Sequence, residues 1–485
     1  MLLSGVASAP PKSAFKAADT LSRHLEELCR PGAWERRTKD GDKALLEYVE
    51  AEARDLSVEA FSRLMTDVYQ RIGSMLLKGN DIARRLGGVL AIDELTDVKL
   101  SGDDAAKTSR LAALLSRVLE DSEEAGLSEA AAHTLGHLVR SGGAMTSDIV
   151  EKEIRRALAW CDPRVEPSEC RRLTALLVLH EAAESAPAVF NVHVKAFIDA
   201  VWFPLRDPKQ HLREAAVRAL KACLCLVEKR ETRYRVQWYY KLFEQTMRGM
   251  KRDHRSGAMP SPESIHGSLL ALGELLQHTG EFMLARYKEV VENVFRYKDS
   301  KEKNIRRAVI HLLPRMAAFS PERFASEYLS RAIAYMLTVL KNPPERGAAF
   351  AALADMAAAL ARVNCAAGFE GCLSPIYAAI REALSAPPAA RAAARPRPAP
   401  CPEALQCVGM LATALGPLWR PYAAALIEAM VLTGISEVLV RSLTQVATAL
   451  PELLGDIQYP LLDLLSLVLS KRPFNSSTTQ PSSRP

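Results

Sequence analysis

The feature that most constrains this chain is the pattern of residues 207–224, which reads DPKQHLREAAVRALKACL. Its apolar side chains recur every three or four residues, so they share one face of an α-helix. Ala215, Ala216 and Ala219 on that face are small enough to admit a neighbouring helix at the short end of the ~8–10 Å packing range. The pattern therefore predicts a half-buried helix that stacks against another helix.

The start of this helix is predicted at residue 207 or 208. The Asp207 carboxylate can accept a hydrogen bond from a first-turn amide, and Pro208 lacks an amide where none is needed. Gln210 stands at the position that a capping box would use.

Helices of the same kind recur along the chain at a nearly constant period. With the Ala216 position as marker, related helices centre on Gly88, Ala131, Ala175, Ser268, Val309, Ala349, Cys407 and Thr444. Successive markers are separated by 43, 44, 41, 52, 41, 40, 58 and 37 residues. A period near 40 residues with two helices per unit is typical of HEAT and armadillo repeats. We therefore expect an all-α fold, an α-solenoid of HEAT-like repeats forming an armadillo-type superhelix.

The domain organisation follows from this period. We expect a leading segment with short helices at 1–57, a HEAT-repeat array at 58–472 and a disordered tail at 473–485. The two long steps coincide with Pro-, Gly- and Arg-rich loops at 247–262 and 385–400. Doubling the length of a loop costs only about 0.6 kcal/mol, so these insertions need not break the stack.

We assign an arginine just ahead of the buried marker position in five units. These arginines are Arg172, Arg213, Arg306, Arg346 and Arg441. In HEAT arrays this arginine typically pairs with an acid of the preceding turn and forms a ladder between units. Asp207 and Asp299 supply that acid here, so we predict a partial ladder that sets register and performs no chemistry. Pro208, Ala216 and Leu220 complete the structural positions of the motif at 207–220.

The composition favours an intracellular helical protein. The chain is 48% hydrophobic but only 6% aromatic, which suits Leu- and Ala-lined helix seams. A net charge of +6 over 485 residues attracts polyanions weakly, so we expect no direct nucleic-acid binding. The nine cysteines form no CxxC pair, which favours a reducing compartment. No apolar run is long enough for a signal peptide or a membrane span, so we expect no membrane insertion and a cytoplasmic location.

No catalytic motif stands out. His180 and Glu181 begin an HExxH pattern, but Glu184 occupies the place of the second histidine. Gly-rich phosphate loops and the nucleophile elbow GxSxG are not found. We expect no catalytic, cofactor-binding or metal site in this chain. Trp202 and the aromatic residues 238–240 are interpreted as packing at helix ends.

Six ordered blocks carry a more specific resemblance. FPLRDPKQHLREAAVRALKACLCL (203–226), EIRRALAW (153–160) and QWYYKLFEQ (237–245) belong to it. The others are SIHGSLLALGELL (264–276), HLLPRMAAFSPERF (311–324) and DIQYPLLDLLSLVLSKRP (456–473). Together they resemble the N-terminal HEAT region of the TOR (target of rapamycin) Ser/Thr protein kinases, members of the PI3K-related kinase family. The resemblance covers roughly 58–473.

This resemblance implies an interaction scaffold in nutrient and growth signalling. Such an arm would pack against the middle HEAT region of a second TOR protomer and would support assembly with a Raptor-type subunit. A Rheb-type small GTPase would map near 81–116. The family's kinase domain, which uses ATP and Mg, matches nothing here. The resemblance also implies that, as part of the TOR complex, the protein would be found at endomembrane surfaces and in the nucleus.

A second interpretation stays open. A free-standing HEAT adaptor of the importin or phosphatase-scaffold type would need polar capping units at both ends. The helix expected at 460–470, PLLDLLSLVLS, is apolar nearly all round, which indicates that another surface covers it. That favours the interpretation as an arm of a larger protein, although a short isoform without a kinase domain is also compatible with the sequence.

Overall fold

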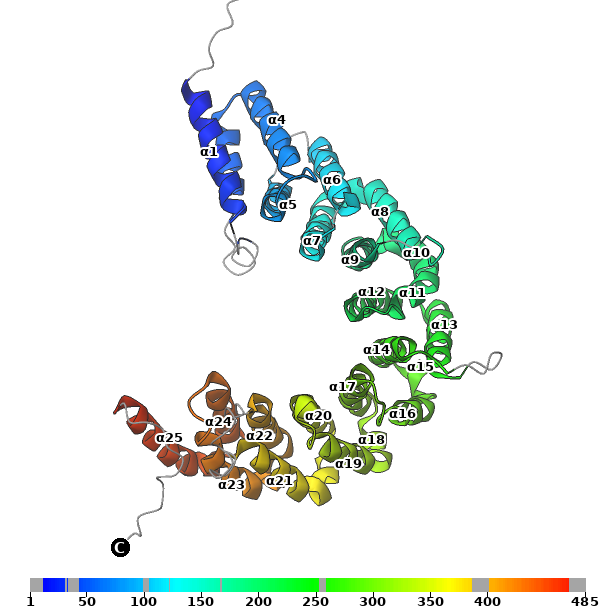
Figure 1. The fold of residues 1–485 in the computed structure, drawn as a ribbon, viewed down its shortest axis with the longest axis vertical. Coiled ribbons are helices and arrows are strands. Elements are labelled where there is room, and N and C mark those ends of the chain that lie inside the picture. Colours follow the sequence, from blue (N-terminus) through cyan, green and yellow to red (C-terminus); the bar gives the residue numbers. More distant parts are fainter. Residues whose placement is uncertain are drawn as a thin grey trace, which may run out of the picture. The chain divides into compact units, whose positions relative to one another are not determined.

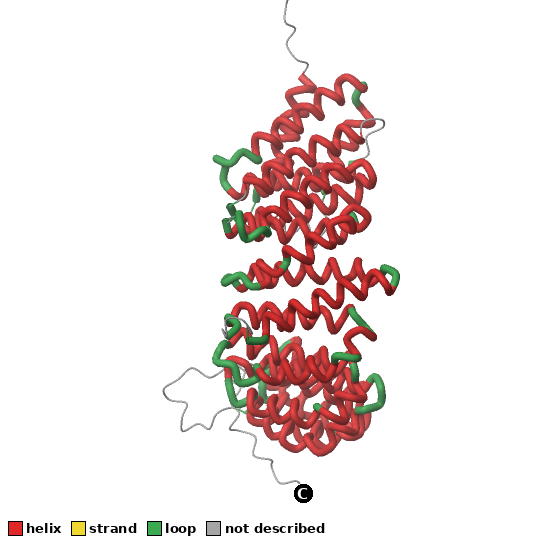
Figure 2. Tube along the Cα trace, turned by 90° about the vertical axis from the view of Figure 1, so that its right-hand side faces the viewer, coloured by secondary structure: helices red, strands yellow, loops and turns green. Residues whose placement is uncertain are grey.

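The computed structural model describes residues 12–30, 33, 43–98, 104–121, 123–165, 168–252, 259–385 and 401–470. Every regular element within these ranges is a helix, and no strand occurs in them (Figure 2). The prediction of an all-α fold is confirmed. None of the helices in these ranges combines the length and the apolar character that a membrane crossing requires.

The chain divides into two compact units, Met1–Gly249 and Met250–Pro485. Within each unit the helices form two layers, which we call the A and B layers (Figure 1). Each repeat contributes an A helix followed by a B helix. The sequence predicted one array at 58–472, and its continuity across the two units stays a prediction.

In the first unit, successive B helices pack side by side and each packs on A helices of its own or the next repeat. The B helices are α5 (Ile82–Asp97), α7 (Ala125–Gly142), α9 (Glu169–Ser185) and α12 (Gln210–Glu228). The A layer holds α4 (Val58–Met75), α6 (Asp104–Asp121), α8 (Ser147–Trp160), α10 (Pro187–Ala200), α11 (Trp202–Leu205) and α13 (Thr232–Met250). The 3-10 turn η1 (Gly143–Thr146) joins α7 to α8. Because a B helix has neighbours on three sides, its sequence is apolar around most of its circumference, as in the fully buried run 173–179 of α9.

The second unit repeats the two layers. Its B helices are α14 (Pro262–His278), α17 (Lys303–Phe319), α20 (Pro343–Ala361), α22 (Pro402–Leu415) and α24 (Glu437–Ala449). Its A layer holds α15 (Glu281–Leu284), α16 (Tyr287–Arg296), α18 (Pro321–Glu327), α19 (Leu329–Val339), α21 (Leu373–Leu384), α23 (Arg420–Val431) and α25 (Leu454–Leu469). Short 3-10 turns lie at η2 (Ala366–Cys372), η4 (Gly416–Leu418) and η5 (Pro451–Leu453).

The leading segment packs against the stack. Its helices are α1 (Lys12–Leu28) and α3 (Ala44–Asp55), and both contact α5. Short helices within 1–57 were expected, and the first of them, α1, begins at Lys12. Buried Glu94 of α5 fixes α3, because its carboxylate accepts the backbone amides of Leu45 (2.9 Å) and Leu46 (3.2 Å). These amides at a helix start have no partner within the helix.

Serine caps begin four of the helices. The hydroxyl oxygen of each accepts the amide three residues later. The caps are Ser57 before α4, Ser168 before α9, Ser261 before α14 and Ser436 before α24.

The predicted start of α12 was wrong. The helix begins at Gln210, because the Asp207 carboxylate accepts the amide of Lys209, two residues on (2.8 Å), and holds a turn ahead of the helix. Gln210 uses its side chain on Glu214 (Nε2 to Oε1, 2.7 Å) and does not close a capping box there.

Eight of the nine marker positions are buried, including Gly88, Ala216 (0% exposed) and Ser268. The ninth was wrong, because Thr444 is exposed and α24 buries Ser442, Leu443 and Val446 instead. The repeat register of that last unit is therefore shifted by one or two residues from the predicted one.

Loop boundaries differ from the prediction at one place. The loop expected at 247–262 is shorter, since α13 continues to Met250 and α14 begins at Pro262. Of the loop at 385–400, residues 386–400 lie outside the described residues, as does the tail at 473–485.

Candidate functional site

The structural feature that repeats most faithfully in both units is an arginine near the start of a B helix. In α12, Arg213 is buried (4% exposed) and donates through Nη1 to the carbonyl oxygens of Asp207 (2.6 Å) and Pro208 (3.0 Å). These carbonyls lie six and five residues before the arginine, in the turn that leads into the helix. We call this arrangement the arginine clamp. It gives the turn a buried donor where main-chain carbonyls would otherwise lack one.

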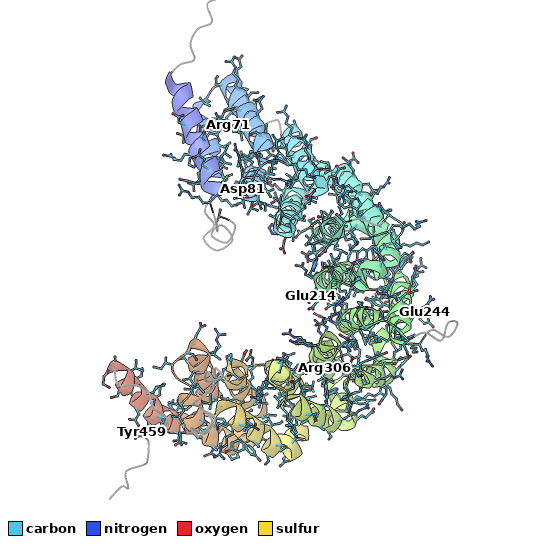
Figure 3. All side chains as sticks on the ribbon, in the orientation of Figure 1. Arg71, Asp81, Glu214, Glu244, Arg306 and Tyr459 are labelled. Atoms are coloured by element: carbon cyan, nitrogen blue, oxygen red, sulfur yellow. The ribbon has the colours of Figure 1, made fainter. Side chains whose placement is uncertain are left out.

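The clamp recurs in the second unit. Arg306 of α17 donates through Nη1 to the carbonyls of Ser300 (2.8 Å) and Lys301 (2.9 Å), again six and five residues earlier (Figure 3). Arg346 of α20 donates through Nε to the carbonyl of Leu340 (3.0 Å), six residues earlier. Three clamps with the same spacing indicate a property of the repeat and not of one turn.

Two arginines near the start of a B helix, Arg172 and Arg306, join adjacent repeats through a buried acid. Arg172 of α9 reaches the Asp207 carboxylate of the next repeat (Nε to Oδ2, 3.0 Å), and Asp207 is 3% exposed. Arg306 binds the carboxylate of Glu345 of the next repeat (Nη2 to Oε1, 2.6 Å; Nε to Oε1, 3.0 Å), and Glu345 is 4% exposed. The hydrogen bond to Glu345 raises the pKa of Arg306, which strengthens its preference for the charged form.

The predicted ladder therefore has a different arrangement in the structure. Asp299 does not serve Arg306, because its carboxylate is 77% exposed and pairs loosely with Lys298 (3.8 Å). Glu345, which lies in the following repeat, takes that role. Arg441 is also outside the ladder, since it is exposed and pairs within its own helix with Glu437 (2.7 Å). An acid four residues away on an exposed helix face stabilises the helix by only about 0.3–0.5 kcal/mol.

The remaining positions of the motif divide between the core and the turn that precedes α12. Ala216 and Leu220 are fully buried, and Pro208 stands exposed in the turn where its carbonyl serves the clamp. Sequence reasoning missed Arg85, which stands three residues before the Gly88 marker and is buried in α5 (6% exposed). The constant spacing of arginine to marker was the signal that could have found it.

A half-buried polar group, His137, joins α5 to α7 and was also missed. His137 of α7 contacts two carboxylates of α5, Asp93 (Nδ1 to Oδ1, 2.7 Å) and Asp97 (Nε2 to Oδ1, 2.9 Å). Its hydrogen bond to Asp93 raises the pKa of His137, against the opposing effect of burial. Burial by itself would raise the pKa of Asp97, but the hydrogen bond from Lys43 and the charge of His137 outweigh it and lower that pKa.

The ionisable groups described above pair with one another across neighbouring repeats. Within the described ranges, no three His, Cys, Asp or Glu side chains gather in a way that could hold a metal ion. His180 and Glu184 contact each other on α9 at 3.8 Å. Burial raises the pKa of Glu181 to about 7, so this side chain is substantially neutral near neutral pH.

Among residues 81–98 and 104–116, the described parts of the region where a GTPase was expected, few side chains are exposed. In α5, residues 85–96 are buried or half-buried, so the accessible side chains of these two ranges lie at 81–84 and on the outer face of α6. That face includes Ser109, Arg110 and Ala113. The structure describes residues 104–116 of this stretch but not 99–103.

Solved structures define the class of protein to which this arrangement belongs. The fold is similar to that of Kap121p bound to Nup53p, with a TM-score of 0.53 over 96% of this chain and 44% of that one. It is similarly close to Kap121p bound to Pho4p, with a TM-score of 0.54 over 97% of this chain. Sequence identity is 13% in both, so the likeness concerns the fold alone. The chain is an α-solenoid of helical repeats, as the sequence predicted.

Curated protein sequences are similar to this chain over most of its length. The chain is 43% identical over 464 residues to the Serine/threonine-protein kinase TOR of Arabidopsis thaliana, and 45% identical over 429 residues to that of Oryza sativa subsp. japonica. The tor1 kinase of Schizosaccharomyces pombe is 30% identical over 434 residues. No protein-family profile matches the chain. The chain is homologous to part of the TOR kinases, and the predicted resemblance is confirmed. The matches to the Arabidopsis and Oryza proteins cover 95% and 88% of this chain, but the chain spans only about one sixth of those proteins (17% and 16%).

Proposed function

We propose that this chain acts as a protein-interaction scaffold, the N-terminal HEAT arm of a TOR kinase that supports assembly and dimerisation of the TOR complex. Its homology to TOR kinases and its solenoid fold support a scaffold role. The observation that carries the proposal is an apolar face on α25 that the other described helices leave uncovered.

That face runs along the length of α25. Its exposed side chains are Leu454 (46%), Tyr459 (75%), Leu462 (62%), Leu465 (40%), Val468 (53%) and Leu469 (82%). Ile457 and Leu464, on the other side of the helix, are buried against the unit. Tyr459 is labelled on α25 in Figure 3. Contiguous exposed apolar side chains of this kind mark surfaces that bind other proteins, since burying them gains about 25 cal/mol per Å².

The partners follow from the family resemblance. The α25 face would pack on the middle HEAT region of a second TOR protomer, and a Raptor-type subunit would bind elsewhere on the scaffold. A Rheb-type GTPase would contact residues 81–84 and the outer face of α6. ATP and Mg would be used by the kinase domain of the parent protein. The protein would work in the cytoplasm, at endomembrane surfaces and in the nucleus.

Substitution on α25 tests the interaction. Leu462→Glu places a charge on the exposed face, and Val192→Glu on α10 is the matched control because Val192 is also exposed (76%) and apolar. Two differently tagged copies of the parent kinase should co-precipitate from cells, and Leu462→Glu should reduce the yield about tenfold, or 1.4 kcal/mol. Equal yields for Leu462→Glu, Val192→Glu and the unaltered protein would contradict the proposed role of α25.

The size of the native protein distinguishes the two interpretations left open by the sequence. An antibody raised against residues 201–224 is used on a denaturing blot of cell extract. A band several times heavier than 53.2 kDa would agree with an arm of a TOR kinase. A band near 53.2 kDa would indicate a free-standing scaffold and would contradict the arm proposal.

A further inference from the structure

Beside one repeat joint of the first unit lies a cavity of about 890 Å³. Its wall is formed by the end of α8, the turn after it, Arg172 of α9, the end of α10, and α11 with the turn that follows. Leu158, Ala196 and Phe203 give it apolar surface. The volume falls in the range of roughly 300–1,000 Å³ that is usual for ligand sites, and is far too large for a single ion or water molecule.

The carboxylates on this wall already have partners. Asp162 binds Arg164 (Oδ2 to Nη2, 2.5 Å), and Asp199 forms an ion pair with Lys241. The third, Asp207, pairs with Arg172 in the repeat joint described above. None of the three is therefore left to neutralise a further cation.

Two N–H donors on the same wall have no acceptor among the described residues. Trp202 is 8% exposed, and its indole Nε1 is buried without a hydrogen-bond partner. The Nε of Arg206 is likewise buried without a partner, and the guanidinium carbon lies 5.7 Å from the centre of the Trp202 ring. Among the described residues, Arg206 makes one long hydrogen bond, from Nη2 to the carbonyl oxygen of Gln245 (3.5 Å). A buried donor without an acceptor costs about 1–3 kcal/mol, so a ligand that supplies the acceptors recovers this free energy.

The charges around these two donors indicate which kind of anionic ligand the cavity favours. No carboxylate of the described residues pairs with Arg206. Both burial and the nearby charge of Arg248 lower its pKa, and an added negative charge would reverse this shift. Two donors match the two oxygens of one carboxylate. A phosphate would bring a larger negative charge toward a wall that carries three carboxylates, and is disfavoured for that reason.

We infer that this cavity binds an extended protein segment through one Asp or Glu side chain, whose carboxylate accepts hydrogen bonds from Trp202 Nε1 and Arg206 Nε while a neighbouring apolar side chain packs on Phe203 and Leu158. The inference deepens the proposed scaffold function by assigning a second contact, of defined chemistry, in the first unit. It uses none of the residues of the α25 face.

Peptide arrays provide the test with the full 485-residue chain. The arrays hold nine-residue peptides with Glu, Gln or phosphoserine at the centre, and the residues on either side are varied between apolar and polar ones. Some Glu-centred peptides with an apolar neighbour should retain the labelled chain, and their Gln-centred counterparts should bind about tenfold more weakly, as expected for loss of a charge-assisted hydrogen bond.

Variants of the chain locate the site. Trp202→Phe keeps an aromatic ring, smaller than indole, and removes the indole N–H, and Arg206→Gln removes the charge. Each should weaken the best Glu-centred peptide about five- to tenfold in fluorescence anisotropy. Arg63→Gln, an exposed and distant position with the same change of charge, should leave the affinity unchanged. Equal thermal melts of the variants confirm that they fold.

Several results would overturn the inference. These are an absence of retained Glu-centred peptides, equal binding of Glu- and Gln-centred peptides, and affinity unchanged by both cavity variants. Stronger binding of phosphoserine peptides would replace the carboxylate by a phosphate ligand. Binding of free succinate without any peptide would make the occupant a small acid. Failure here while Leu462→Glu still disrupts co-precipitation would refute the cavity assignment alone and leave the scaffold proposal standing.

Discussion

Removal of the Asp207 carboxylate should destabilise the first unit more than any comparable change at a turn. In Asp207→Ala, Arg172 loses its carboxylate partner and the amide of Lys209 loses its acceptor. Removing one partner of a buried ion pair costs about 3–5 kcal/mol. Because 20% of the Arg172 side chain is exposed, water compensates part of the loss, and we expect about 3 kcal/mol.

Native-state hydrogen exchange measured by mass spectrometry is the suitable assay, because a repeat array need not unfold in a single step. A loss of 3 kcal/mol should raise the opening equilibrium of amides in α9 and α12 about 100-fold. Amides of α22 and α24, in the second unit, serve as an internal reference. Asp207→Asn keeps an acceptor for Lys209 and loses only the charge, so its effect should be intermediate.

Asp299→Ala is the matched control. Asp299 also occupies a turn ahead of a B helix, but its side chain is 77% exposed, and its removal should change stability by no more than about 0.5 kcal/mol. If exchange in Asp207→Ala were as slow as in Asp299→Ala, the buried acid would not join the two repeats.

Three further changes give distinct results in thermal melts followed by circular dichroism. In the folded protein the pKa of Glu181 is raised to about 7, so the stability associated with its protonated form is lost as pH rises from about 4.5 to 7. Glu181→Gln should then be more stable than the unaltered chain at pH 8, by at most about 3 kcal/mol, and the difference should vanish near pH 4; an equal difference at both pH values would contradict this. Conversely, His137→Gln should destabilise the chain more at pH 6 than at pH 9. The pKa of His137 is raised in the folded protein, so its charged form stabilises the fold below about pH 6.5, and this stabilisation is lost as the pH rises through the folded-state pKa. A loss independent of pH would show that the charge of His137 contributes nothing. Ala216→Arg buries a charge in a helix seam and should cost several kcal/mol, and an unchanged melt would refute the assigned repeat register.

The repeats were predictable because their signal is periodic and local. Apolar spacing, and an arginine three residues before a buried position, identified the B helices and the clamp residues Arg213, Arg306 and Arg346. The partners of the arginines were harder to predict. Asp299 and Asp207 look alike in sequence, but only the packing of the next helix decides which carboxylate is buried. Glu345 lies 39 residues beyond Arg306, and the sequence around it does not indicate that it pairs with this arginine.

The helix start at 207 and the cavity show the same limit. Asp207 has the residue type of a helix cap, yet its carboxylate also meets Arg172 from another repeat, and no local propensity contains that contact. The cavity combines residues from 158 to 208 that four helices, α8, α9, α10 and α11, bring together. Trp202 was noticed as part of a local aromatic cluster, but its unpaired indole N–H depends on tertiary packing.

The arginine clamp determines which substitutions the turns before the B helices can tolerate. Its acceptors are main-chain oxygens, which every amino acid carries, and the clamped residues Asp207, Pro208, Ser300, Lys301 and Leu340 accordingly have little in common. Mutations that exchange these side chains leave the acceptors in place, whereas a mutation that removes the arginine does not. Over evolutionary time such turns can therefore drift apart in sequence while the repeats keep their geometry.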